Sequence, residues 1–405
     1  MTEQIVIAGA GHAAGQVVAT LKQQKFAGKI VLIGDEPFLP YQRPPLSKKY
    51  LSGEMPPERL YVKPPSFYDD PQIEIRLNTR VVAVHRDDHR VAVNTGDDIH
   101  YDKLVLALGS RVRQMPVPGA ELAGIHYLRD IADVDAIRAE MDQNRNLLIV
   151  GAGYIGLEVA AVARQSGLDV TVVEMAERVM SRVVSPEISD FYQIEHAARG
   201  VNLRLATGIS AFRGDARVDS VETSDGEQIP ADFVVVGVGI LPNTELAAEA
   251  GLAIDNGIVV DDRCQTSDPD IFAIGDCSMH PNAIYDRPLR LESVQNALEQ
   301  AKTAASNICG KEAHYSEVPW FWSDQYDLKL QIAGLSDGYD SVVIRGNPAD
   351  RSFACLYLRD GVLIATDAVN APRDFVQSKA LIAARARIDP EILSDNDVQL
   401  KEMTT

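Results

Sequence analysis

Short apolar runs that end in glycine-rich turns organise the first half of the chain. The first run, Ile5 to Ala8, leads into the turn GAGHAA at residues 9–14, and the small residues that follow predict a helix to about Gln24. A second apolar run, Ile30 to Ile33, closes next to Asp35. The order of strand, glycine turn, helix, strand and acid is typical of a βαβ unit that binds a dinucleotide.

The same order recurs later in the chain. An apolar strand, Leu147 to Val150, precedes the turn GAGYIG at residues 151–156, and a helix is predicted to about Gln165. Strand Val170 to Val173 then ends at Glu174. Because both turns lie between a strand and a helix and both are followed by an acid, they indicate two dinucleotide sites rather than two chance turns.

The segments downstream of the two βαβ units also match. Residues 95–109 mirror residues 224–239, since each has a turn, a short polar strand, an acid and a β-branched run that closes on glycine. A strand hairpin is predicted upstream of the first segment, at residues 81–93. The acid and the closing glycine are Asp102 and Gly109 in the first copy, and Asp232 and Gly239 in the second. The chain therefore contains two related α/β nucleotide-binding folds.

The C-terminal part of the chain has a different pattern. A strand ends in Gly275-Asp276, and a long helix is predicted over Ser293 to Ile308. Beyond it, a strand hairpin turns at Asp360-Gly361 and a helix follows near Asp374 to Ala386, which indicates a smaller α+β domain. The predicted domains are residues 1–112 with 240–310, residues 113–239, and residues 311–405.

The chemistry of the two turns points to a flavin and a nicotinamide. The first glycine permits the sharp bend, the second lets backbone amides approach a diphosphate, and the third position, Ala14 or Gly156, must be small. Glu174 suits a ribose hydroxyl and repels a 2′-phosphate, which favours NADH over NADPH, although Arg178 and Arg182 leave NADPH open. Two different nucleotides in one chain suggest FAD and NADH, between which hydride can pass.

Asp276 sharpens the flavin assignment. A carboxylate at a strand end, beside a glycine that permits close approach, suits the hydroxyls of a ribityl chain. The alternative is a plain strand-end turn in which Gly275-Asp276 caps Ser278. The first site is therefore assigned to FAD and the second to NAD.

Charge and composition exclude several functions. A net charge of −19 argues against unaided binding to nucleic acid or to an anionic membrane. Met1 to Gln4 form no basic signal segment, and the longest apolar run, residues 233–241, is a strand with glycines, so a cytoplasmic enzyme is expected. The four cysteines form no C-x-x-C pair and are expected to be buried or idle thiols, and no histidine spacing predicts a metal site.

Three segments outside the nucleotide motifs carry a family resemblance: PYQRPPLSK at 40–48, RLESVQNALEQA at 290–301 and PWFWSDQYD at 319–327. With the two turns they resemble the oxygenase-coupled NADH-dependent ferredoxin reductases, the putidaredoxin reductase-like family. The resemblance covers essentially the whole chain. It implies two Rossmann-like dinucleotide-binding domains of glutathione-reductase type, one for FAD and one for NAD, plus a C-terminal α+β domain.

The resemblance also implies an activity. The expected enzyme is an FAD-dependent NADH:ferredoxin oxidoreductase, a monomer or weak homodimer, which passes electrons singly to a [2Fe-2S] ferredoxin of a cytochrome P450 or ring-hydroxylating dioxygenase system. Residues 43–48 contain no cysteine pair, so electrons must leave directly from the flavin. The alternatives are a rubredoxin reductase, an NADH oxidase, or an NADH-sensing flavoprotein resembling apoptosis-inducing factor.

The resemblance places Lys48 beside the reactive edge of the flavin and Glu158 near Lys48 and the nicotinamide, as the two catalytic residues. From the sequence alone, Lys48 is equally a solvated lysine and Glu158 a first-turn helix acid. With the motifs, the resemblance implies an FAD site of Gly9, Gly11, His12, Ala13, Ala14, Asp35, Arg43, Lys48, Val81, Ala107, Gly109, Arg129, Gly275, Asp276, Glu292, Ser293, Val294 and Trp322. The NAD site is expected to comprise Gly151, Gly153, Tyr154, Ile155, Gly156, Glu158, Glu174, Gly237 and Gly239.

Several of these residues have plainer interpretations. Arg129 fits a surface position, Val81 and Val294 fit a core, and Trp322 fits either a core or a cavity wall facing the flavin. His12 either tunes a diphosphate contact or occupies a variable position. A patch of basic residues near the flavin entrance is a hypothesis for steering an acidic partner. This patch comprises Arg43, Lys48, Lys49, Arg287 and Arg290.

Overall fold

The computed structural model describes residues 3–143 and 145–403, so the expectation for the N-terminal segment falls, at Met1 and Thr2, outside the described residues. The chain divides into two compact units, each built from separated segments. The first unit holds the described residues of Met1–Arg43, Pro57–Arg111 and Leu241–Pro319. The second holds Pro44–Pro56, the described residues of Val112–Ile240, and those of Trp320–Thr405.

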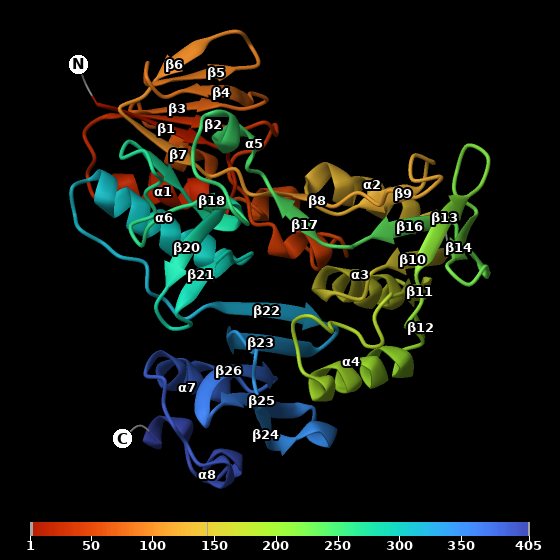
Figure 1. The fold of residues 1–405 in the computed structure, drawn as a ribbon. Helices are drawn as coiled ribbons and strands as arrows, with labels where there is room; N and C mark the ends of the chain where they lie inside the picture. The colour runs from red at the N-terminus through yellow and green to blue at the C-terminus, as the bar shows by residue number, and fades with distance from the viewer. Residues whose placement is uncertain (1–2, 144, 404–405) are drawn as a thin grey trace. The chain divides into compact units, whose positions relative to one another are not determined.

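The first unit is built on a parallel sheet with strand order β19-β7-β1-β2-β3 (Figure 1). Helices α1 (His12–Gln23) and α6 (Val294–Ile308) pack against each other and bury one face of the sheet through Ile5 and Ile7. The other face, with Val6, packs on a core that includes the antiparallel strands β4 and β5. The sheet strands are β1 (Gln4–Ala8), β2 (Lys29–Ile33), β3 (Ile73–Arg76), β7 (Lys103–Leu106) and β19 (Ile271–Ala273).

Smaller elements complete the first unit. The antiparallel set is β4 (Val81–His85), β5 (Arg90–Val93) and β6 (Asp98–His100), and a second set is β18 (Ile258–Val259), β20 (Ser278–Asn282) and β21 (Arg287–Leu289). The short helices are η2 (Pro57–Arg59), η3 (Pro65–Tyr68), α5 (Glu245–Glu249) and η4 (Gly275–Cys277). Strands β8 (Ser110–Val112) and β17 (Ile240–Pro242) span the chain positions at which the units change.

The second unit repeats this plan in a parallel sheet of order β12-β11-β10-β16-β9. Its strands are β9 (Ile125–Tyr127), β10 (Asn146–Val150), β11 (Asp169–Val173), β12 (Asn202–Arg204) and β16 (Phe233–Val236). Its helices are η1 (Pro44–Ser47), α2 (Ile131–Met141), α3 (Tyr154–Gln165) and α4 (Pro186–Ala198). An antiparallel set of β13 (Ile209–Arg213), β14 (Ser220–Thr223) and β15 (Gln228–Pro230) packs on the sheet core.

The second unit also contains the C-terminal α+β segment, an antiparallel sheet of order β22-β23-β26-β25-β24 with α7 packed on β23 and β26 (Figure 1). Its hairpin turns at Asp360-Gly361, both with positive φ, as the sequence predicts. The strands are β22 (Trp320–Gln325), β23 (Leu328–Gly334), β24 (Ser341–Asn347), β25 (Ser352–Arg359) and β26 (Val362–Val369). The helices are η5 (Pro348–Asp350), α7 (Pro372–Ala383), α8 (Pro390–Ser394) and η6 (Leu400–Glu402).

Matching hydrogen bonds show that the two βαβ units are copies of one plan. Asp102 accepts a bond from the backbone N–H of Gln4 at 2.6 Å, and Asp232 accepts the equivalent bond from the N–H of Asn146 at 2.8 Å. Asp102, just before β7, thus fixes the start of β1, and Asp232, just before β16, fixes the start of β10 in the same way. The predicted fold class, two Rossmann-like domains with a C-terminal α+β part, is confirmed.

Two local predictions need correction. The run at 233–241 is not one strand, because β16 ends at Val236 and Gly239 takes a φ of +103°, which breaks the extended backbone. Similarly, Gly275-Asp276 lies in the 3-10 turn η4 and not at the end of β19. Among the described residues, no helix combines the length and apolar character that a membrane crossing requires.

Candidate functional site

The first glycine of each turn is required by close backbone packing. A Cβ on Gly9 would lie 2.2 Å from the carbonyl oxygen of Ala107, and one on Gly151 would lie 2.4 Å from that of Gly237. Both glycines also have positive φ, +110° and +103°. Any side chain at either position would therefore clash with the neighbouring strand end, whether or not a ligand is bound.

The second glycine of each turn is not required by the protein itself. Gly11 and Gly153 have φ of −87° and −78° with extended ψ, which any residue adopts. A Cβ on either would meet no protein atom within 4 Å. Each precedes a helix whose first turn has no side-chain cap. The open space above uncapped N–H groups fits a diphosphate, so both turns fit a dinucleotide.

The third position differs between the turns. Gly156 lies so close to its own turn that a Cβ would be 2.1 Å from the carbonyl oxygen of Gly151. Its counterpart in the first turn, Ala14, is fully buried, and the adjacent Ala13 is nearly so. Beside them, Tyr154 is partly buried and Ile155 is exposed at the start of α3. In both copies tight packing therefore leaves room only for a small residue at the third position, as predicted.

Glu174 is positioned at the second turn by the backbone. Its carboxylate accepts a hydrogen bond from the N–H of Ala152 at 2.7 Å and another from the N–H of Ala176 at 2.9 Å. Arg178 donates to Val184, Ser181 and Ser189, so its guanidinium is already committed. The cation that remains available for a 2′-phosphate is therefore Arg182, which is exposed and lies near Gly239.

The predicted ribityl contact lies in the first unit at η4. Gly275 has a φ of +77°, and a Cβ there would sit 3.6 Å from the Cβ of Ala13. The Asp276 carboxylate accepts a hydrogen bond from the Ser110 hydroxyl at 2.8 Å. The hydroxyl of Ser278 donates to the carbonyl oxygen of Gly275 and to Gln300, so the turn does cap Ser278 through Gly275, as the plainer alternative expects, while the Asp276 carboxylate takes no part in that cap.

His12 begins α1 as a neutral side chain. Burial, together with the nearby charge of Arg43, lowers the pKa of His12 to about 4, while Asp276 acts in the opposite direction. A neutral imidazole beside the uncapped helix start can donate one N–H to an anion. The Arg43 guanidinium itself bonds to Glu36 at 2.6 Å and to the hydroxyl of Tyr41 at 2.9 Å.

The remaining predicted FAD residues are placed as follows. Val81 begins β4, Asp35 is exposed after β2, and Gly109 has positive φ after β7. Glu292 pairs with Arg290 at 2.6 Å, Ser293 caps α6 by accepting the N–H of Asn296, and Val294 is the first residue of α6. The N–H of Arg129 donates to Asp133, and Trp322 stacks near Trp320. Lys48, Arg129 and Trp322 belong to the second unit and the other members to the first.

Lys48 and Glu158 form a buried ion pair within the second unit. The Lys48 Nζ lies 2.7 Å from Glu158 Oε2, with 1% of the Glu158 side chain and 15% of the Lys48 side chain exposed. The 3-10 turn η1, which its prolines favour, ends just before Lys48, and the Nζ also donates to the carbonyl oxygen of Pro44. Glu158 lies in the second turn of α3. The two plain alternatives, a solvated lysine and a first-turn acid, are therefore wrong.

Two serines that the sequence analysis missed complete this pair. The hydroxyl of Ser47 donates to Glu158 Oε2 at 2.5 Å, and the hydroxyl of Ser323 donates to Oε1 at 2.6 Å. Both serines are fully buried or nearly so. Ser47 is adjacent to Lys48, which is a signal in the sequence, whereas nothing local marks Ser323.

The basic residues proposed for steering are mostly paired. Lys48 pairs with Glu158, Arg43 with Glu36 and Arg290 with Glu292. Lys49 and Arg287 are exposed. Carboxylates thus neutralise Lys48, Arg43 and Arg290, which weakens the proposed positive patch at these positions.

The four cysteines are free thiols. Cys264, Cys277 and Cys355 are buried, and Cys309 is partly exposed. Burial raises the pKa of the Cys277 thiol to about 11, so it remains protonated at neutral pH. These thiols are packed as small apolar groups, which agrees with the expectation of buried or idle thiols.

The two dinucleotide-binding turns, one in each unit, indicate a pyridine nucleotide oxidoreductase with a second dinucleotide cofactor. Residues 3–301 match the family described as pyridine nucleotide-disulphide oxidoreductase, and residues 320–404 match the reductase C-terminal family. The chain belongs to the pyridine nucleotide-disulphide oxidoreductase family.

Individual relatives are similar along their whole length. The 5,5'-dehydrodivanillate O-demethylase ferredoxin reductase subunit of Sphingobium sp. (strain NBRC 103272 / SYK-6) is 46% identical over 402 residues, 98% of each chain. The crystal structure of the ferredoxin reductase for the CYP199A2 system of Rhodopseudomonas palustris matches with a TM-score of 0.96 and 43% identity over 99% of each chain. The covalent putidaredoxin reductase–putidaredoxin complex matches with a TM-score of 0.96 and 42% identity, over 99% of this chain and 98% of that chain.

These findings confirm the resemblance to the ferredoxin reductase family, the class of FAD-dependent oxidoreductase and the cofactors FAD and NAD(H). The family description includes a disulphide, but residues 43–48 carry none of the four cysteines.

Proposed function

We propose that this chain is an NADH:ferredoxin reductase that serves a cytochrome P450 or ring-hydroxylating dioxygenase system. NADH and two oxidised [2Fe-2S] ferredoxins become NAD⁺, one proton and two reduced ferredoxins, so the electrons balance. FAD, when bound, supplies the conversion between a hydride pair and single electrons. The observation that carries the proposal is the buried pair of Lys48 and Glu158 on the nucleotide-binding helix α3, in a segment without cysteine.

The residues have separate proposed roles. The turn from Gly151 to Gly156 holds the diphosphate of NADH, and Glu174 holds its ribose hydroxyl. The first turn, with Asp276, holds FAD. The Lys48 ammonium stabilises negative charge on the reduced ring, and Glu158 aligns that ammonium. Residues 1–112 with 240–310, 113–239 and 311–405 are proposed as the FAD, NAD and C-terminal domains.

The relatives support the choice of acceptor. One is named as the ferredoxin reductase subunit of an O-demethylase, and another is crystallised with putidaredoxin. The buried thiols support direct electron release to such an acceptor, because no reactive disulfide is built near Lys48. We also propose that the enzyme is cytoplasmic and a monomer or weak homodimer, which sedimentation of the FAD-loaded protein can test.

Rapid mixing tests the proposal directly. Anaerobic protein is first reduced with NADH while the flavin absorbance is followed, and is then mixed with a [2Fe-2S] ferredoxin, a rubredoxin or oxygen. We expect fast flavin reduction and the fastest reoxidation by ferredoxin. Faster reoxidation by rubredoxin or by oxygen would assign the chain to the corresponding alternative. Slow reoxidation by every acceptor would favour the NADH-sensing flavoprotein.

A further inference from the structure

Strand β22 presents every second side chain to helices α3 and α4 of the second unit. The ring of Phe321 lies 4.8 Å from that of Tyr154 on α3, and the hydroxyl of Ser323 reaches Glu158 one helical turn further along. Two residues on, Gln325 reaches His196 of α4. This follows from the strand period of two and the helix spacing of four residues.

A continuous chain of hydrogen bonds runs outward from the Glu158 carboxylate. Ser323 donates to Glu158 at 2.6 Å, and the side-chain amide of Gln325 donates to the Ser323 oxygen at 3.2 Å. The Gln325 carbonyl lies 2.8 Å from His196 Nε2, and the Tyr326 hydroxyl lies 3.2 Å from His196 Nδ1. Ser323, Gln325, His196 and Glu158 are all nearly or fully buried.

Every donor in this chain points toward Glu158. A carboxylate only accepts, so Ser323 must donate to it, and Gln325 must then offer its carbonyl to His196. Burial lowers the pKa of His196 to about 4, so the ring is neutral. Because the Gln325 carbonyl faces Nε2 and can only accept, the single ring proton is assigned to Nε2. Tyr326 in turn donates to the free Nδ1. No member can reverse its bond without leaving a buried neighbour unsatisfied.

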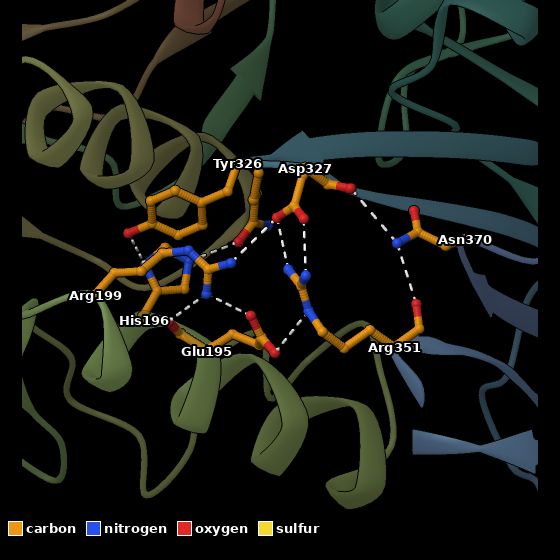
Figure 2. A network of polar contacts seen from close by, with 8 residues as sticks. Glu195, His196, Arg199, Tyr326, Asp327, Arg351 and Asn370 are labelled. Atoms are coloured by element: carbon orange, nitrogen blue, oxygen red, sulfur yellow. Dashed lines mark hydrogen bonds and ion pairs between the residues drawn. The ribbon is translucent and has the colours of Figure 1, made fainter. Parts of the chain in front are cut away.

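The outer end of the chain is fixed by a ring of charges, shown in Figure 2. Arg199 and Arg351 each contact both Glu195 and Asp327, and the Arg199 guanidinium lies 4.4 Å from the ring centroid of Tyr326. The hydrogen bonds from Arg351 lower the pKa of Asp327 to about 2, so the ring stays charged above acid pH. Tyr326 and Asp327 form the turn between β22 and β23.

The turn needs such support. Tyr326 has a φ of +58°, a conformation that a residue with a side chain rarely adopts. Asn370 adds a hydrogen bond from its side-chain amide to the carbonyl oxygen of Arg351 at 3.1 Å (Figure 2). Together these contacts hold the end of β22 against α4, which sets the position of Ser323.

We propose that Ser323 is a positioning residue for the reaction. Its hydroxyl, held by Gln325, His196 and Tyr326, keeps the Glu158 carboxylate aimed at Lys48. The C-terminal segment thereby controls the lysine–carboxylate pair on α3. This inference rests on the proposed role of that pair in hydride transfer.

The test compares Ser323→Ala with Ser378→Ala in the FAD-loaded protein. Ser378 is an equally buried serine of the same segment, and its hydroxyl bonds only locally, to the carbonyl oxygen of Phe375. We expect S323A to lower the limiting rate constant of flavin reduction about 10-fold, the effect of one hydrogen bond to a charged group. The half-saturating NADH concentration should stay unchanged. S378A should match the wild type in both quantities, and an equal loss in S378A would overturn the proposal.

A double-mutant cycle separates action through Glu158 from general damage. In a Glu158→Gln background, S323A should cause no further decrease, because the carboxylate that it positions is gone. Additive losses would overturn the positioning role. If E158Q alone leaves flavin reduction unchanged, the proposed function of the lysine–carboxylate pair fails instead.

Two further measurements do not depend on turnover. The infrared carboxylate band that E158Q removes should shift in S323A but not in S378A. Gln325→Leu, which keeps the side-chain size and removes the outer links, should shift the same band less. Ser323→Thr should restore the rate, because it restores the hydroxyl. An unshifted band in S323A would contradict the inference even if that variant proved less stable.

Discussion

Helices α1 and α3 each follow a glycine turn of the same type, but their second helical turns carry different side chains. The equivalent positions, seven residues after the first glycine (16 − 9 and 158 − 151), hold Gln16 and Glu158. The Gln16 amide bonds to Thr20 of its own helix at 3.0 Å, whereas Glu158 bonds to Lys48 and to Ser323, far away in the sequence. Under the proposed function, the shared scaffold holds a nucleotide in both copies, and Glu158 gives the second copy its role in the reaction.

The acids that end the second strand of each copy differ in the same way. Asp35 is exposed, whereas the Glu174 carboxylate is held by the N–H groups of Ala152 and Ala176. A carboxylate held in this way cannot turn aside for a 2′-phosphate. The proposed NADH site, whose nucleotide must enter and leave in each cycle, thus has its acid fixed by two backbone N–H groups.

The largest effect is expected when the first glycine of one turn is replaced by alanine, one copy at a time. Gly151→Ala forces a Cβ against the Gly237 carbonyl at positive φ and should weaken NADH binding by about 3 kcal/mol, more than a hundredfold. Gly9→Ala meets the same obstacle at Ala107 and should instead release FAD. Flavin content and NADH titration measure the two outcomes. FAD loss in G151A, with normal NADH binding, would reverse the assignment of the turns.

The next largest effect is expected on the stability of the protein when Glu158 on α3 is removed. Glu158→Ala leaves the ammonium of Lys48 in a mostly buried place without its partner, which should lower the free energy of unfolding by about 3 kcal/mol. The matched change in the other copy, Gln16→Ala, removes only a bond within α1 and should cost about 1 kcal/mol or less. Urea unfolding of both variants checks the difference. Equal losses would show that the buried pair adds nothing to the scaffold.

Acid should destabilise the second copy through His196. The folded pKa of His196, about 4, lies below its ordinary value of 6.5, so the unfolded chain binds more protons between these values. Stability is then full above pH 6.5 and is lost as pH falls toward 4. Between pH 7 and pH 5 the wild type should lose about 2 kcal/mol more than His196→Gln, as measured by urea unfolding at each pH. Parallel losses in both proteins would show that His196 does not titrate in this way.

Local patterns made much of the fold predictable. The strands and helices of both βαβ units follow from short apolar runs and glycine turns, whose spacing depends on neighbouring residues alone. The same holds for the hairpin turn at Asp360-Gly361 and for α6, which begins just after its cap Ser293. The break after Val236 could not be predicted, because the apolar, β-branched run at 233–241 has the pattern of a single strand.

The candidate site was predictable only in part. The glycines and acids of the turns are visible in the sequence, and Lys48 and Glu158 came from the family resemblance. The link from Ser323 to Glu158 joins residues 165 positions apart and depends on how β22 packs on α3. No local pattern encodes such a contact. The burial of Glu158 is likewise a result of packing, since a mostly apolar helix with one acid reads equally as an exposed face.

The smallest expected effect concerns the choice of coenzyme. Glu174→Ser removes the charge that opposes a 2′-phosphate, while exposed Arg182, beside Gly239, remains as a cation to receive one. The ratio of kcat/KM for NADH to that for NADPH should fall about 10-fold, with both coenzymes compared in flavin reduction. Asp35→Ser, the matched change in the first copy, should leave this ratio unchanged and lower FAD retention instead. A shift in coenzyme preference from Asp35→Ser would mean that the two acids do not serve different nucleotides.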